Sequence, residues 1–208
     1  MDFDLFLSKV THLKTATLGG LDAQFRLAPK LRLRYDANKI KAKNPKKAAV
    51  LALFYPNKKN ETCFLLTERA TYKGTHSAQI SFPGGKMDTS DTNLLETALR
   101  ETFEEIGVQQ SSIEIIREIT DVYIPPSNFL ATPFIGFTKK QPTFKTNNEV
   151  ETIIEVSLSD LLDGSNIKTV TISTSYMQNT DVPCFKLNNY IVWGATAMML
   201  NEIKELIL

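Results

Sequence analysis

The hydrophobic and polar positions along the chain form blocks that predict both strands and helices. Residues 48–55 are a continuous apolar run that ends before Pro56, which is typical of a strand buried on both faces. Residues 62–67 form a second run after the polar turn at 57–60, so the two runs predict a β-hairpin. Similar patterns predict further strands at 113–123, 131–137, 168–172 and 189–193.

The clearest helical pattern covers residues 92–106. Asp91 stands where a capping side chain is expected, and Gly107 is placed to end the helix. A period of 3.6 residues puts four side chains on one face and predicts this buried stripe: Leu95, Leu99, Thr102 and Ile106. Other helices are expected at 2–13, 158–162 and 195–207. The whole pattern predicts an α/β fold with a mixed central sheet and helices outside it.

The composition is that of one ordinary domain with a modest appendage. The chain has 208 residues, of which 42% are hydrophobic and 23% charged, so it can bury a core. We expect residues 1–45 to form an N-terminal helix and a basic arm packed on the domain. Residues 46–208 are expected to form the domain itself.

Several features favour a cytoplasmic protein. No run of about 18 apolar residues occurs, which predicts that no segment spans a membrane. The first ten residues begin with an acidic side chain and lack the layout of a secretory signal. Cys63 and Cys184 have no neighbours at metal-ligand spacing, which favours two buried thiols in a reducing compartment.

The net charge of +1 conceals a basic segment at residues 26–47, which holds nine basic side chains and one acidic side chain. A solvated arm leading into the first core strand is the favoured interpretation. Alternatively, the segment brings phosphates toward a bound metal ion, or it touches RNA. It lacks the interleaved aromatic residues of a platform that stacks single-stranded bases, so we expect no nucleic-acid partner.

The most informative segment is an acidic turn in the helix at 92–106. Glu101, Glu104 and Glu105 fall within one turn, where they repel one another, and they lie near the helix C-terminus, which favours cations. A divalent cation would remove this conflict, because it needs several carboxylate oxygens in a small volume. The chain has only two histidines and two cysteines, so we expect Mg²⁺ or Mn²⁺ held by oxygen rather than zinc. Arg100 can pair with one carboxylate and orient it.

The stretch Arg100-Glu101-Thr102-Phe103-Glu104-Glu105-Ile106-Gly107-Val108, preceded by Gly85, resembles the Nudix box. Thr102 occupies a position that is usually apolar. The usual glutamate between the glycine and the helix is missing, Asp91 is the nearest acid, and the spacing to Arg100 is one residue longer. These variations are similar to the coenzyme A diphosphatase subgroup, as are the segments 65–69, 79–86 and 193–197.

The resemblance implies a Nudix-like α/β/α sandwich and assigns roles to the box. Glu101 and Glu105 are expected to bind Mg²⁺ or Mn²⁺, and Glu104 to act as a further ligand or to orient water. Arg100 is expected to hold a carboxylate in place. The resemblance also implies that a Gly84–Gly85 turn offers a carbonyl to the metal ion and lets phosphate approach the backbone.

Other roles lie outside the box. The general base of the family varies and often lies on a loop, so Glu149 is the first candidate and Glu151 the second. His76 is a weaker candidate, because a loop histidine more often makes local hydrogen bonds. Trp193 and the helix after it are expected to pack in the core. The residues that bind the rest of the substrate are not identified by the pattern.

Three functions remain open at this point. The first is metal-dependent hydrolysis of coenzyme A (CoA) or acyl-CoA to adenosine 3′,5′-bisphosphate and 4′-phosphopantetheine or its acyl derivative. The second is the same chemistry on ADP-ribose or another nucleoside diphosphate derivative, which Pro125 favours because ADP-ribose-cleaving relatives carry a proline nearby. The third is a nucleotide- or RNA-binding domain without turnover. We expect a small-molecule partner and no membrane partner, and leave a homodimer open.

Overall fold

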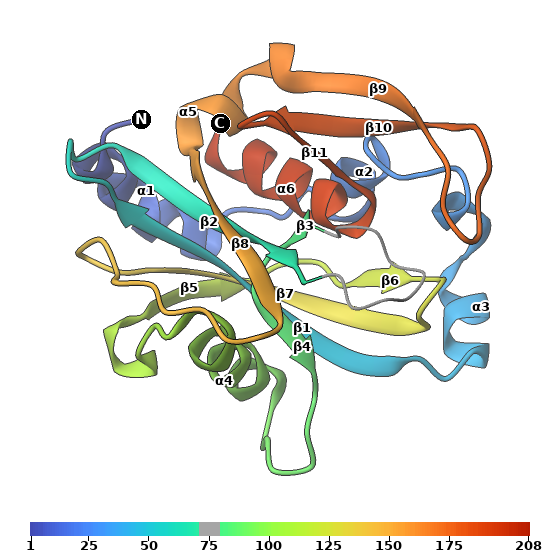
Figure 1. The fold of residues 1–208 in the computed structure, drawn as a ribbon, viewed down its shortest axis with the longest axis horizontal. Helices are drawn as coiled ribbons and strands as arrows, with labels where there is room; N and C mark the ends of the chain where they lie inside the picture. The colour runs from blue at the N-terminus through green and yellow to red at the C-terminus, as the bar shows by residue number, and fades with distance from the viewer. Residues whose placement is uncertain (71–79) are drawn as a thin grey trace.

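The computed structural model describes residues 1–70 and 80–208, and a mixed eight-stranded sheet lies at its centre (Figure 1). Strand β1 (Lys46–Pro56) is antiparallel to β2 (Thr62–Arg69) and parallel to β7 (Phe129–Phe137). Phe54 pairs with Phe64 across the first two strands, which confirms the predicted hairpin. The other strands of this sheet are β3 (Ile80–Ser81), β4 (Gly84–Lys86), β5 (Glu114–Glu118), β6 (Val122–Ile124) and β8 (Val150–Ser157).

The strand order within these residues is β3-β2-β1-β7-β5, and three further strands pair with members of this series. Strand β4 also pairs with β1, β6 with β7, and β8 with β2. A separate three-stranded antiparallel sheet has the order β11-β10-β9. Its strands are β9 (Ile167–Ile172), β10 (Thr180–Leu187) and β11 (Tyr190–Trp193).

Helices cover both faces of the large sheet, as Figure 1 shows. Helix α4 (Leu94–Ile106) packs on one face, and α1 (Phe3–Thr15) and α6 (Gly194–Ile207) pack on the other. The predicted α/β fold with a mixed central sheet is therefore confirmed. The shorter helices are α2 (Gly20–Phe25), α3 (Ala37–Ala42) and α5 (Leu158–Leu162), with 3₁₀ turns η1 (Arg32–Arg34), η2 (Gln110–Ser112) and η3 (Gly164–Asn166).

Strand β1 separates two hydrophobic clusters because successive side chains point to opposite faces. Leu51 and Leu53 are fully buried in the cluster beneath α4. Ala52 and Phe54 are fully buried in the larger cluster beneath α1 and α6. Burial on both faces explains why this strand is a continuous apolar run in the sequence.

The N-terminal residues contribute to the larger cluster. The ring of Phe6 stacks on Phe54 with centroids 5.1 Å apart. A second anchor joins α2 to α6, where the buried carboxylate of Glu202 accepts hydrogen bonds from Gly20 N at 3.1 Å, Gln24 Nε2 at 2.8 Å and Thr120 Oγ1 at 2.6 Å. One helix and an arm were expected here, whereas the structure also has α2 and α3. A domain boundary at residue 45 stays a prediction.

Three other details differ from the predicted elements. The strand expected at 113–123 is two strands, β5 and β6, both paired with β7. Strand β10 was not predicted, because Pro183 in its middle argues against a strand from local sequence. Strand β8 was also not predicted, although its pairing with β2 covers seven residue pairs. Long-range pairing, rather than local pattern, determines both.

The cysteines and the lengths of the helices can be compared with the sequence-based expectations. Cys63 and Cys184 are both buried free thiols. Among the helices of residues 1–70 and 80–208, none is long and apolar enough to span a membrane.

Candidate active site

Helix α4 begins and ends at well-defined caps. The side chain of Asn93 accepts a hydrogen bond from Glu96 N at 3.0 Å, and Glu96 Oε2 in turn accepts one from Thr92 N at 2.7 Å. Asn93 therefore caps the helix, and the prediction that Asp91 does so is wrong. The predicted stop at Gly107 is confirmed, since its φ of 75° lies in the left-handed region that glycine adopts freely.

The buried face of α4 differs in part from the predicted stripe. Thr102 and Ile106 are fully buried, as predicted. Leu95 and Leu99 are only half-buried and pack at the edge of the cluster. Ala98 and Thr97 take the central positions instead. The buried face thus keeps Thr102 and Ile106 and extends to Thr97 and Ala98 in place of Leu95 and Leu99.

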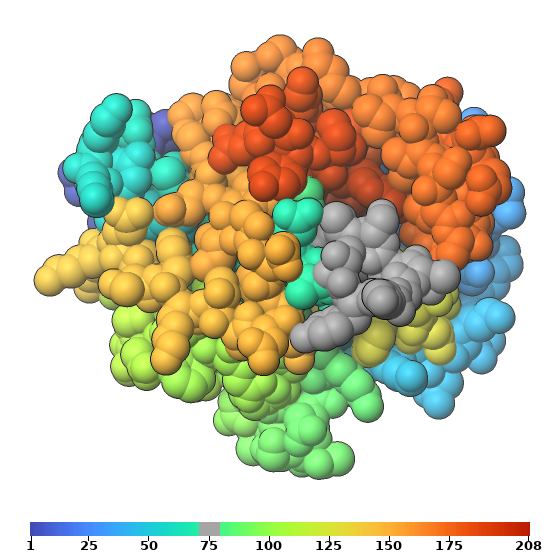
Figure 2. All heavy atoms as spheres, in the orientation of Figure 1, coloured from blue at the N-terminus to red at the C-terminus, as the bar shows by residue number. Residues whose placement is uncertain are grey.

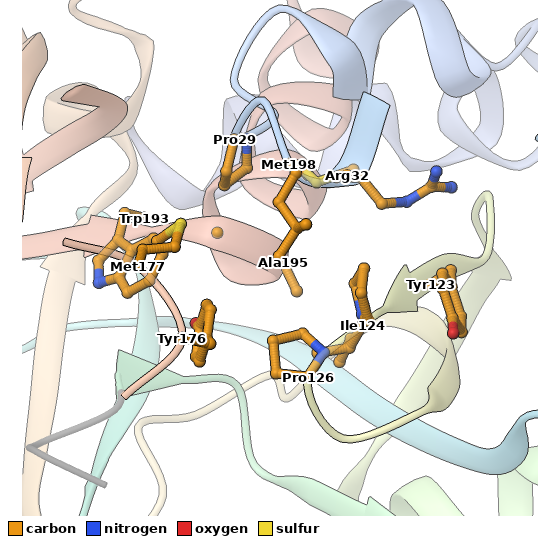
Figure 3. Close-up of a pocket in the computed structure, with 13 residues that line it drawn as sticks. Pro29, Arg32, Tyr123, Ile124, Pro126, Tyr176, Met177, Trp193, Ala195 and Met198 are labelled. Carbon is orange, nitrogen blue, oxygen red and sulfur yellow. The ribbon is translucent and has the colours of Figure 1, made fainter. Parts of the chain in front are cut away.

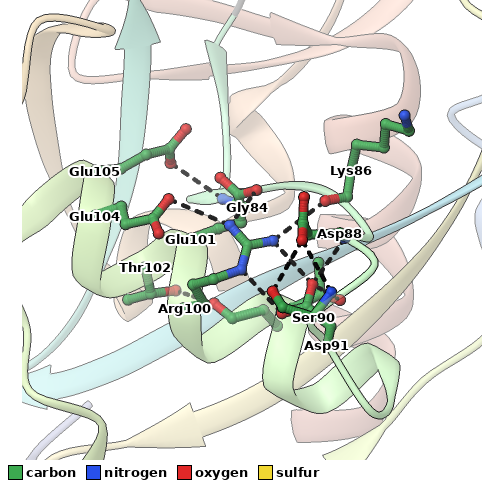
Figure 4. Close-up of polar contacts among 12 residues, drawn as sticks. Gly84, Lys86, Asp88, Ser90, Asp91, Arg100, Glu101, Thr102, Glu104 and Glu105 are labelled. Atoms are coloured by element: carbon green, nitrogen blue, oxygen red, sulfur yellow. Dashed lines mark hydrogen bonds and ion pairs between the residues drawn. The ribbon is translucent and has the colours of Figure 1, made fainter.

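Arg100 is the centre of the polar network in Figure 4, and it contacts three carboxylates. Its Nε and Nη2 atoms donate to the two oxygens of Asp91, each at 2.9 Å. Its Nη1 atom donates to Glu101 at 2.9 Å and to Glu104 at 3.2 Å. The sequence predicted one such partner. The site therefore holds three acids around one guanidinium.

Asp91 is the partner that sequence reasoning missed. Its side chain is only 4% exposed, and Thr97 Oγ1 and Asp88 N also donate to it. Hydrogen bonds from Arg100 hold the pKa of Asp91 well below its usual range. Asp91 in turn raises the pKa of Arg100. The longer spacing before Arg100 was the only signal in the sequence that could have indicated this pair.

Strand β4 brings two glycines against the acidic turn. Gly84 N donates to Glu105 Oε2 at 3.1 Å. A Cβ atom added to Gly85 would lie 2.5 Å from Glu101 Cδ, so only glycine leaves room for this carboxylate. The expected Gly84–Gly85 turn is wrong, because both residues belong to a strand paired with β1. Pairing fixes the backbone against which the two carboxylates lie.

Burial and crowding change the acidity of these carboxyl groups. The pKa of Glu105 is raised to about 7, chiefly by burial; the Gly84 N–H acts against this, and the nearby carboxylates of Glu101 and Glu149 act with it. Burial also raises the pKa of Glu101, although Arg100 acts against this. Burial therefore raises the pKa of both carboxyl groups, and a bound cation would act in the opposite direction.

Glu149 lies near the acidic turn, although it comes 44 positions after Glu105 in the sequence. Its backbone carbonyl accepts a hydrogen bond from Ala70 N at 2.9 Å, and its carboxylate forms an exposed ion pair with Arg69 at 3.8 Å. Figure 2 shows the residues just before β8 lying against those of α4. Asn147 N donates to the carbonyl oxygen of Glu105 at 3.2 Å, so the loop that carries Glu149 lies against the end of α4, and the charge of Glu149 acts on Glu101 and Glu105.

The other residues considered from the sequence lie away from the acidic turn or outside the described residues. Glu151 is exposed in β8, and among the described residues no hydrogen bond or ion pair joins its side chain to the acidic turn. His76 lies outside the described residues. Helix α6 is buried as expected, but Trp193 is only half-buried and lines a surface pocket, so its assignment to the core is corrected.

Comparison with known proteins identifies the family. The family model of the NUDIX domain matches residues 45–172. This chain belongs to the Nudix hydrolase family. It is 31% identical over 146 residues to a protein of Yersinia enterocolitica described as an uncharacterized Nudix hydrolase NudL, covering 70% of this chain and 74% of that protein. It is also 31% identical to Nudix hydrolase 3 of Caenorhabditis elegans, covering 69% and 66%.

A solved structure agrees with the fold. The chain superimposes on a MutT/Nudix family protein from Enterococcus faecalis with a TM-score of 0.52 at 14% identity, covering 81% of this chain and 68% of that one. At this identity the match speaks for the fold alone.

The donor chemistry of the Nudix helix suits Mg²⁺ or Mn²⁺. Glu101, Glu104 and Glu105 supply hard oxygen ligands from one helical turn, which these ions prefer. Within residues 1–70 and 80–208, no three His, Cys, Asp or Glu side chains already converge on one point. Arg100 and Gly84 N–H hold the carboxylates apart here. Binding an ion would therefore need small side-chain rotations.

Proposed function

We propose that this Nudix protein hydrolyses the diphosphate of CoA or acyl-CoA in a reaction that depends on Mg²⁺ or Mn²⁺. The products would be adenosine 3′,5′-bisphosphate and 4′-phosphopantetheine or its acyl derivative. The observation that carries the hydrolase proposal is the set of carboxylates on α4, packed against Gly84 and Gly85 of β4. The preference for CoA rests on the similarity of segments 65–69, 79–86 and 193–197 to the CoA diphosphatase subgroup.

The ionised carboxylates of the acidic turn would bind the metal ion. Glu101 and Glu105 would be the principal ligands, and Glu104 would be a further ligand or orient water. When bound, the ion would neutralise charge on the diphosphate and lower the pKa of water. Gly84 and Gly85 carry no side chain, so a phosphate group can approach their backbone closely.

Hydrolysis needs a water molecule to attack one phosphorus atom while the bridging P–O bond breaks. The attacking oxygen loses a proton, and the leaving phosphate keeps the electron pair of the broken bond. Glu149 would accept the proton, since it lies beside Glu101 and Glu105 and has an exposed carboxylate. Arg100 would act indirectly, by fixing the orientation of Glu101 and Glu104.

Product analysis tests this proposal directly. The protein would be incubated with CoA, an acyl-CoA, ADP-ribose, NADH and dinucleoside polyphosphates, with Mg²⁺ or Mn²⁺, and the products identified by mass spectrometry. We expect CoA and acyl-CoA to give the highest kcat/KM. If ADP-ribose is cleaved faster than both, the CoA assignment is wrong and the Nudix chemistry stands. If no substrate is cleaved, a non-catalytic nucleotide- or RNA-binding domain replaces the proposal.

A further inference from the structure

A surface pocket lies away from the acidic turn and shares no lining residue with it. Four segments build its walls: the region of η1, strand β6 with the turn after it, the loop between β9 and β10, and the start of α6. Figure 3 shows Arg32 and Tyr123 toward one end and Tyr176, Met177 and Trp193 toward the other. The pocket thus combines one cation with a largely aromatic and apolar lining.

Arg32 is a buried cation with little to compensate it. Arg32 is only 4% exposed, and its Nη1 atom donates a hydrogen bond to the carbonyl oxygen of Tyr35 at 2.9 Å. The guanidinium lies over the rings of Phe25 and Tyr123, with 5.1 Å and 5.9 Å to their centroids. Its Nε atom is buried and has no hydrogen-bond partner, and no carboxylate of the described residues forms an ion pair with it.

The half-buried Arg100 of the acidic turn offers a contrast. Arg100 contacts three carboxylates, whereas Arg32 contacts none within the described part of the chain. Burial therefore lowers the pKa of Arg32. A buried charge without a counter-charge costs stability, so a ligand that brings an anion here would gain from it.

The opposite end of the pocket suits a flat ring. Tyr176 is 40% exposed, and Trp193 is half-buried beside it. Met177 adds a polarizable sulfur atom to the same wall. Aromatic and thioether groups of this kind bind planar rings through stacking and dispersion. A ligand that fills the whole pocket would therefore carry an aromatic ring and an anionic group.

The sheet places this pocket within reach of the acidic turn. Strand β4, which carries Gly84 and Gly85, is followed across the sheet by β1, β7 and then β6, which forms a wall of the pocket. Lys86, Ala48, Ala131 and Val122 are aligned across these four strands. Three strand spacings amount to about 14 Å. A substrate with two long halves joined by a diphosphate extends over such a distance.

We propose that this pocket binds the 3′-phosphoadenosine half of the substrate, with the base against Trp193 and Tyr176 and the phosphate at Arg32. The inference rests on the proposed function for the identity of the ligand, but its evidence comes from different residues. It assigns a role to one of the nine basic side chains in the segment 26–47. It also gives Trp193 a role outside the core.

The single tryptophan of the chain reports on the pocket directly. Adenosine 3′,5′-bisphosphate would be titrated into the whole protein, with Trp193 excited at the red edge of its absorption, where adenine does not absorb. We expect saturable quenching, and at least about tenfold weaker binding of adenosine 5′-monophosphate, because one charge-assisted hydrogen bond is lost. Binding seen by calorimetry without any change in Trp193 emission would place the ligand elsewhere and overturn the proposal.

Three variants separate the parts of the pocket. Arg32→Met keeps much of the packing volume and should abolish the preference for the bisphosphate. Arg34→Met removes an exposed cation two residues away, which does not line the pocket, and should leave the preference unchanged. Tyr176→Ala changes an exposed loop residue and should weaken the binding of both nucleotides by the same factor. If Arg32→Met does not fold, the proposal is tested by the fluorescence titration of the wild type and of Tyr176→Ala. Wild-type affinity of Tyr176→Ala for the nucleotides would then overturn the proposal.

Hydrolysis of CoA and dephospho-CoA distinguishes failure of the pocket from failure of the function. We expect the wild type to prefer CoA in kcat/KM by about 10- to 150-fold and Arg32→Met to lose this preference. If the wild type cleaves CoA but Arg32→Met keeps its preference, the pocket proposal is wrong and the function stands. If CoA is not cleaved but bisphosphate binding depends on Arg32, the pocket stands and the function is wrong.

Discussion

Asp91 and Arg100 form a two-pronged ion pair, with Nε–Oδ1 and Nη2–Oδ2 distances of 2.9 Å each. This pair connects the loop before α4 to the turn that carries the acidic residues. With two of its nitrogens fixed by Asp91, Arg100 presents Nη1 to Glu101 and Glu104. The geometry of the acidic turn therefore depends on a residue outside it.

We expect Asp91→Asn to lower kcat by about 10- to 100-fold while KM changes little, because Arg100 would no longer be held in place. Asp91→Glu should restore part of the loss. Asp88→Asn is the matched control, since Asp88 is an exposed acid of the same loop that makes no hydrogen bond to Arg100. Steady-state kinetics with Mg²⁺ checks this, and full activity of Asp91→Asn would contradict it.

Glu101→Gln and Glu105→Gln should each reduce kcat by at least about 100-fold, a loss comparable with removing a principal electrostatic element. Both substitutions preserve shape and remove the charge that would hold the ion. Glu96→Gln, in the first turn of the same helix, should retain activity. Near wild-type turnover in both folded variants, measured by product formation, would remove these residues from the site.

Gly85→Ala should be nearly as damaging as the loss of Glu101. A Cβ atom at this position would lie 2.5 Å from the Glu101 carboxyl carbon and displace it. The backbone of Gly85 is not left-handed, so the effect should come from the lost position of the carboxylate and not from backbone strain. Gly85→Ala should therefore cause a large fall in kcat, measured by steady-state kinetics, but only a small change in Tm, measured by thermal unfolding. Retained activity would show that the carboxylate can move freely.

The helix and its acidic turn could be predicted because their signals are local. Glu101, Glu104 and Glu105 lie within five residues, and Gly107 ends the helix by its own conformational freedom. The α/β fold class was likewise predicted from local patterns along the chain, among them the continuous apolar run of β1. Elements of this kind need no information about distant residues.

The contacts that complete the site could not be predicted in the same way. Gly84 and Gly85 form a strand only because β1 pairs with them, and Glu149 reaches the turn only because β8 pairs with β2. The capping role of Asn93 left Asp91 free for Arg100, a choice that depends on the loop between them. Burial of Arg32 likewise depends on packing among segments far apart in the chain.

Divalent metal should raise the thermal stability of the protein. An ion that binds only the folded chain stabilises it by mass action, so Tm should increase with the concentration of Mg²⁺ or Mn²⁺ in the millimolar range. Glu101→Gln should reduce the shift, whereas Glu114→Gln, an exposed acid on β5, should not. Calorimetric scans measure this. No shift in the wild type at millimolar Mg²⁺ and Mn²⁺ would count against a metal site at the acidic turn.

Glu105, whose pKa is raised to about 7 in the folded protein, should make the stability of the protein depend on pH. Because the folded state holds this proton more tightly than the unfolded chain, the resulting stability is fully present below the ordinary glutamate pKa. It is lost as the pH rises toward about 7. Without metal, the contribution of Glu105 should therefore lower Tm between about pH 5 and about pH 8, and Glu105→Gln should remove that contribution. Millimolar Mg²⁺ should diminish the fall, because the ion binds the ionised carboxylate. Calorimetric scans of both proteins across this range test the prediction, and identical pH profiles would show that Glu105 titrates normally.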